Sequence, residues 1–284
     1  MPSPPASPAS PTRADNSDPS SSVNSLEIAT ITFLFLFGAA AIGFFGQRLL
    51  PAHHLSDQSR AAVHLGAGLI ATLAALILGL LVSSTKGSYD QASNLVNEMS
   101  ASYEHADRLL ANYGTDSAGV DAATLRATLR QSLEYALSLV WPEETGSKPV
   151  ALGDRSHSRM LLENVYNRVA LLKASNTGQQ HLQDDTLRAL DDIIQKRWLL
   201  QEVVLGGGIS WILLVIPVLF IAFITLVYAL YAPRNPTVAA VLFCSSLCIA
   251  TAVFLISDLA SPLSGTLKIS SKPLHVALHQ MGAQ

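Results

Sequence analysis

The stretch from Ala61 to Tyr113 reads AAVHLGAGLIATLAALILGLLVSSTKGSYDQASNLVNEMSASYEHADRLLANY and contains no proline. Its first part, up to Thr85, carries no formal charge and is long enough as a helix to cross a membrane. The polar remainder has apolar residues at alternating steps of four and three, which is typical of a helix packed beside others. The pattern predicts a membrane helix that leads into a helix outside the bilayer. Ser88 and Gln91 fit a capping box, which favours a restart of the helix at Ser88.

Small side chains recur at every fourth position of the apolar half of this stretch. They are Ala67, Ala71, Ala75, Gly79 and Ser83. We expect them to line one helix face that another backbone approaches closely. This face is predicted to be either a packing seam or a pore wall.

Charged residues are scarce and concentrated in the middle of the chain. The 284 residues are 49% hydrophobic and only 14% charged, whereas charged residues make up about a quarter of soluble domains. Of the 39 charged residues, 28 lie between Lys86 and Glu202. The net charge of −3 gives no indication of nucleic-acid binding. The composition is that of an integral membrane protein whose partner is the lipid bilayer.

Three further uncharged runs have the length of a membrane span: Ile28 to Gln47, Ile209 to Tyr231 and Thr237 to Ser257. The segment before the first run is acidic rather than basic, which disfavours a signal peptide. The sequence therefore predicts an all-α integral membrane protein, with four transmembrane helices and a helical extramembrane domain between the second and third. The expected parts are a disordered Pro/Ser-rich tail (1–25), transmembrane helices 1 and 2 (26–86), the helical domain (87–202), transmembrane helices 3 and 4 (203–258) and an ordered C-terminal tail (259–284).

The helical domain is predicted to contain four helices with short links, which form a bundle or paired hairpins. After the helix from 88 to 113, they span Asp121 to Trp141, Asp154 to Lys173 and Gln179 to Glu202. The residues expected to face inward are Ala92, Val96, Met99, Tyr103, Ala106, Leu110 and Tyr113, then Leu125, Leu129, Leu133, Ala136 and Val140, then Leu161, Val165, Val169 and Leu172, and finally Leu187, Leu190, Ile194 and Trp198. A short helix from Leu274 to Met281 is expected to lie on the membrane or on this domain.

Groups suited to catalysis or metal binding are few. The chain has no His-Glu-x-x-His and no Gly-x-Ser-x-Gly motif. His275 and His279 lie one turn apart without a nearby acidic third ligand, and Cys244 and Cys248 are predicted to be small buried side chains in an apolar run. We therefore expect no enzyme activity, no metal site and no cofactor.

Lysine and arginine near the span ends predict the orientation. One side has Arg13, Lys86, Lys196, Arg197, Lys268 and Lys272, and the other has Arg48, Arg60 and Arg234. Since positive residues stay inside, the helical domain and both termini are predicted to be cytoplasmic, in a multi-pass protein of the inner (plasma) membrane.

The order of elements, together with several short motifs, resembles the bestrophin-like domain family, mainly bacterial membrane proteins of unknown function. The motifs are Tyr89-Asp90, Asn94 to Glu98, and a tail with Asp258, Pro262, Gly265, Ser270 and Pro273-Leu274. The resemblance covers roughly 33–281. It departs from the family at Met99 and Ser100, where Glu98 is usually followed by Ala-Asn. The resemblance implies kinship with bestrophin anion channels and hence a homo-oligomer.

Two functions from different classes remain open. In the first, the protein is an oligomeric channel for an inorganic ion, with the small-residue face at the pore and Tyr89, Asp90, Asn94 and Glu98 at its cytoplasmic mouth. The carboxylates of Asp90 and Glu98 then favour cations. In the second, it is a non-conducting interaction or sensory protein in which the inward-facing seam of 88–113 continues across subunits. Asp90 and Glu98 are equally compatible with a solvated helix face.

Overall fold

The computed structural model describes residues 24–47, 57–114, 122–142, 155–206, 211–233 and 235–282. Within these ranges every regular element is a helix, which confirms the predicted fold class. The helices are α1 (Ser25–Gly46), α2 (Asp57–Tyr113), α3 (Ala122–Val140), α5 (Arg155–Ala170), α6 (Thr177–Gly206), α7 (Trp211–Tyr231), α8 (Pro236–Leu259) and α9 (Lys272–Gly282). Residues 1–23 of the tail predicted at 1–25 lie outside the described residues.

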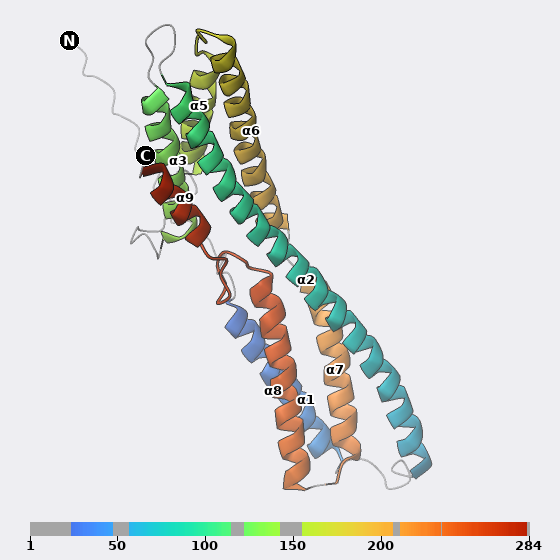
Figure 1. The fold of residues 1–284 in the computed structure, drawn as a ribbon. Helices are drawn as coiled ribbons and strands as arrows, with labels where there is room; N and C mark the ends of the chain where they lie inside the picture. The colour runs from blue at the N-terminus through green and yellow to red at the C-terminus, as the bar shows by residue number, and fades with distance from the viewer. Residues whose placement is uncertain are drawn as a thin grey trace, which may run out of the picture.

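Helix α2 runs through both halves of an elongated molecule (Figure 1). It is one continuous helix of 57 residues, so the restart predicted at Ser88 is wrong. Interactions one turn apart support a continuous helix here. Before Ser88, the Thr85 hydroxyl donates to the Leu81 carbonyl at 2.9 Å. On either side of Ser88, Lys86 forms an ion pair with Asp90. At 1.5 Å per residue α2 is about 85 Å long, much longer than a bilayer is thick.

The membrane half consists of α1, α7, α8 and the first part of α2, and each of these helices is long and apolar enough to span a membrane. Helix α1 packs against α7 and α8, and α2 packs against α7. A Cβ atom built on Gly43 of α1 would lie only 2.4 Å from the Leu226 carbonyl oxygen of α7. At the end of α1, Gln47 Nε2 donates to the Ala229 carbonyl at 2.8 Å. A small residue thus allows α1 and α7 to approach backbone to backbone.

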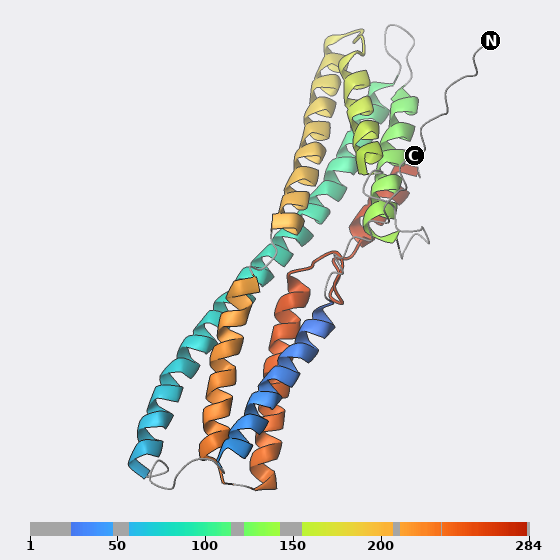
Figure 2. The ribbon, with the colours of Figure 1, turned by 180° about the vertical axis from the view of Figure 1, so that it is seen from behind.

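In the extramembrane half α3, α6 and α9 pack against the second part of α2, and α5 completes the core by packing against α3 and α6. Every seam residue predicted on α2 is buried: Ala92, Val96, Met99, Tyr103, Ala106, Leu110 and Tyr113. This seam is filled within one chain, so the hypothesis that it continues across subunits is wrong. Figure 2 shows from behind that α6 and then α7 lie along α2.

The predicted inward faces of the shorter helices are correct with local exceptions. Leu162 is buried in place of Leu161, and Ala136, Val140, Leu187 and Ile194 are half-buried. Trp198 was predicted to face inward, but it is 52% exposed, and the Arg159 guanidinium lies 4.4 Å from its ring centroid. An aromatic ring with a cation over its face is stable at a surface, which explains this error.

The C-terminal tail docks on the helical half. Ser100 Oγ donates to the Pro273 carbonyl at 2.6 Å, and Trp141 Nε1 donates to the Ile269 carbonyl at 2.9 Å. On α9, Leu274, Ala277 and Met281 are buried against α2 and α3. Of the two predicted positions for this helix, docking on the helical half is the one observed.

Candidate functional site

The row of small residues on α2 does not form a single face. Ala67 is buried and Ala71 half-buried, whereas Ala75, Gly79 and Ser83 are exposed. The reason is geometric: four residues of an α-helix turn about 40° more than one full turn, so the row winds from the packed side to the open side. A Cβ atom built on Gly79 meets no other atom within 4 Å. A role at a pore or between subunits stays a prediction for the exposed part of the row.

The side of α2 that carries Gly79 and Ser83 is called its open side below. In the membrane half it also presents four exposed leucines, namely Leu65, Leu69, Leu76 and Leu80. In the extramembrane half it continues through Asp90, Asn94, Glu98, Ala101 and His105, all exposed. Three of the four predicted mouth residues therefore share one side of the helix. Tyr89 does not, because it is half-buried and packs against the core.

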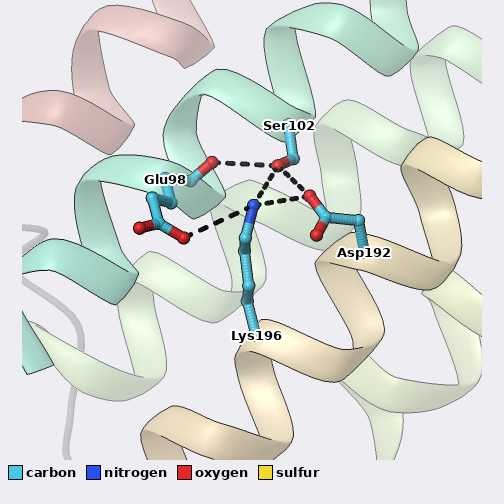
Figure 3. A network of polar contacts seen from close by, with 4 residues as sticks. All are labelled: Glu98, Ser102, Asp192 and Lys196. Carbon is cyan, nitrogen blue, oxygen red and sulfur yellow. Dashed lines mark hydrogen bonds and ion pairs between the residues drawn. The ribbon is translucent and has the colours of Figure 1, made fainter. Parts of the chain in front are cut away.

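A network of charged groups joins this open side to α6 (Figure 3). The Lys196 ammonium donates to the Asp192 carboxylate at 2.5 Å and to Ser102 Oγ at 3.0 Å. It also lies 3.7 Å from Glu98 Oε2. Ser102 Oγ in turn donates to Asp192 at 2.6 Å. The Lys196 side chain is 16% exposed and that of Glu98 is 59% exposed, so a nearly buried cation stands beside an open carboxylate.

The hydrogen bonds of this network hold Asp192 in its charged form. Partial burial raises the pKa of Asp192, but the hydrogen bonds from Lys196 and Ser102 outweigh it, and the pKa is lowered overall. One ammonium between two carboxylates leaves one net negative charge. The group borders a hollow of about 350 Å³, which is lined by Glu98, Ala101, Ser102, His105, Ala189, Asp192 and Lys196.

Sequence reasoning found only Glu98 in this group. Asp192 and Lys196 are spaced four apart on a helix, which is the pattern of an ion pair, and this spacing was the available signal. Because such pairs are common on helix surfaces, the spacing alone does not single out a site. Ser102 carried no signal.

The predicted tail motif forms the connection between α8 and α9. Asp258 is 1% exposed and accepts hydrogen bonds from the backbone N–H groups of Thr266 and Leu267, both at 2.7 Å. A Cβ atom on Gly265 would lie 2.7 Å from Asp258 Oδ1, which explains the need for glycine. The Pro262 carbonyl accepts from the Ile269 N–H at 2.9 Å. These residues shape the connection between the two halves.

The described part of the chain contains no cluster of three or more His, Cys, Asp or Glu that suits a metal ion. His275 and His279 are exposed on α9. Cys244 and Cys248 were predicted to be buried, but both are exposed on α8. They lie on a side of α8 that faces away from the other helices of the chain, where the solvent is lipid and a small apolar side chain needs no protein partner.

The fold has known structural counterparts. Two crystal structures of a bacterial Bestrophin homolog from Klebsiella pneumoniae, each with one substitution, share 13% and 14% identity with this chain, at TM-scores of 0.61 and 0.60. The alignments cover 89% and 92% of this chain and 97% and 98% of those chains. A further structure, described as a membrane protein, has 12% identity and a TM-score of 0.63, covering 89% of this chain and 96% of the other.

A comparison with curated proteins found no significant match. A family model described as the Bestrophin-like domain matches residues 34–274. This range includes the last three membrane spans, the larger part of the first, the Lys196 network and the tail motif up to Leu274. The chain therefore belongs to the Bestrophin-like family.

Proposed function

We propose that this protein is a homo-oligomeric channel of the inner membrane that conducts inorganic ions along the open side of α2. The observation that carries the proposal is the continuity of this side, from Gly79 in the span to Asp90, Asn94 and Ala101 outside it. No described helix of the same chain covers these residues. In a symmetric oligomer, the copies of α2 around the symmetry axis line one continuous ion path. That path runs first through the membrane half and then through the extramembrane half.

Family membership supports the proposal without deciding it. The similar crystal structures share 12% to 14% identity with this chain, which shows the fold alone. Ion conduction by an oligomer, as in bestrophin channels, is therefore a proposal for this chain. The helical half and both ends are proposed to be cytoplasmic, on the basis of the lysine and arginine counts.

Two lysines bear on the charge of the proposed mouth. Asp90 and Glu98 were predicted to favour cations by their charge. Each has a lysine nearby: Lys86 pairs with Asp90, and Lys196 lies 3.7 Å from Glu98. The preference of the proposed channel for cations over anions therefore depends on the balance between these carboxylates and the nearby lysines.

Planar-bilayer recording of the purified protein tests the proposal. We expect ion current, and we expect Gly79→Leu to reduce it, because the new side chain would project from the open side of α2. Gly38→Leu is the matched control, since a Cβ at Gly38 also meets no atom within 4 Å but belongs to α1, which packs against α7 and α8. Silence from folded, oligomeric protein would contradict the proposal.

A further inference from the structure

We propose that Lys196 sets the charge selectivity of the ion path, because its ammonium offsets the carboxylates of Glu98 and Asp192. This inference rests on the proposed function and names the residue that tunes it. It assigns the role to α6, although the open side itself belongs to α2.

The geometry brings Lys196 to the path. Glu98 and Ala101 lie on the same side of α2 as Asp90 and Asn94, so ions that follow this side pass the hollow between α2 and α6. Lys196 lies at that hollow with its ammonium held by Asp192 and Ser102. A lysine held by two partners keeps its charge in one place, whereas a free lysine side chain is flexible.

The charge balance gives the direction of the effect. Glu98, Asp192 and Lys196 together carry one net negative charge per chain, and symmetry repeats this charge around the path. Without the ammonium the same group carries two. Rings of acidic side chains favour cations, so loss of Lys196 raises cation preference, and loss of the Glu98 charge lowers it.

The Lys86–Asp90 pair gives a useful contrast. Both of its side chains are more than half exposed. Charges in open water are screened by salt over about 10 Å, so the electrostatic interaction of this pair with an ion in the path is weaker. The Lys196 side chain is much less exposed, at 16%, and its field is screened less.

The test measures reversal potentials of wild-type and variant protein in a KCl gradient at one fixed pH. We expect Lys196→Gln to raise the permeability ratio of K⁺ over Cl⁻ about threefold. Glu98→Gln should lower the ratio by a smaller factor, because the Glu98 side chain is 59% exposed and its charge is screened more. Arg188→Gln is the matched control, because it removes one positive charge from the same helix at a side chain that is 78% exposed and paired with Asp185. This control is expected to leave the ratio unchanged.

The outcomes separate the inference from the proposed function. If wild-type protein passes no current, the channel proposal fails and this inference falls with it. If current flows but neither variant moves the ratio, the inference alone is overturned, and Lys196 is only a clamp between α2 and α6. If Lys196→Gln does not fold, Glu98→Gln decides, since that side chain is 59% exposed and its loss leaves the clamp to Asp192 intact.

Discussion

The two halves of α2 have the same helical geometry but follow different packing rules. In the membrane half only 17% of the span is buried within the chain. In the extramembrane half all seven predicted seam residues are buried. Water drives apolar side chains together, whereas lipid accepts them and leaves helix contact to small residues and close backbones. A substitution should therefore act through different contacts in each half.

The largest effect is expected in the water-exposed half, at the buried ion pair between α2 and α3. Asp107 is 3% exposed, and Arg126 donates to its two carboxylate oxygens from Nε and Nη2, both at 2.8 Å. The hydrogen bond to Asp107 raises the pKa of Arg126. Asp107→Asn removes the negative charge that compensates the Arg126 guanidinium. We therefore expect the free energy of unfolding to fall by about 3 kcal/mol. Denaturant titration in mild detergent measures this loss.

The control for this pair is Arg108→Gln, because the contact of Arg108 with Glu104 is 3.9 Å long and the Arg108 side chain is 62% exposed. A loss below about 0.5 kcal/mol is expected there. Equal losses in the two variants would mean that burial does not set the strength of ion pairs in this half.

The membrane half should be most sensitive at Gly43. Its α-carbon faces the α7 backbone so closely that Gly43→Ala forces α1 and α7 apart, at an expected cost of about 2 kcal/mol. Gly38→Ala on the same helix has open space around the new methyl group and should be neutral. The thermal midpoint and the monodisperse fraction in one detergent measure both variants. A neutral Gly43→Ala would show that close approach does not hold this half together.

The sequence predicted both halves well where one local signal was enough. Uncharged runs located the four spans, and the alternating steps of four and three identified the seam from Ala92 to Tyr113. A local signal is not enough where the burial of a side chain depends on a helix that is distant in the sequence. The winding of the row from Ala67 to Ser83 places only part of it on the open side.

The Lys196 network was not predictable for a related reason. Ser102 and Asp192 are 90 positions apart and meet only because α2 and α6 pack in one particular register. No periodicity in either helix reports that register. The same is true of Asp258, whose partners Thr266 and Leu267 donate through backbone N–H groups that any residue except proline has.

The connection between the halves gives an intermediate effect. Asp258→Ala leaves the N–H groups of Thr266 and Leu267 without their acceptor, which should weaken the connection between α8 and α9 by about 1 to 2 kcal/mol. Hydrogen exchange of the tail peptide measures this as faster exchange at those two amides. Ser264→Ala, at an exposed position of the same tail, should leave the exchange unchanged. Unchanged exchange in Asp258→Ala would mean that the two halves are joined by other contacts.

The smallest effect is a pH dependence at Asp192, on α6 in the water-exposed half. The folded-state pKa of Asp192 is lowered, so its stabilising contribution is present above the unfolded pKa of about 3.9 and is lost as pH falls through the lower folded value. Asp192→Asn should thus cost stability at neutral pH, by less than about 0.5 kcal/mol because the side chain is 45% exposed. The difference from wild type should narrow as the pH falls below the unfolded pKa. Thermal midpoints from pH 7 down to about pH 3 measure it. Asp184→Asn, exposed on the same helix, is the control. A difference that stays constant over this range would mean that the Asp192 side chain acts through its shape, and that its charge adds nothing to the packing of α2 against α6.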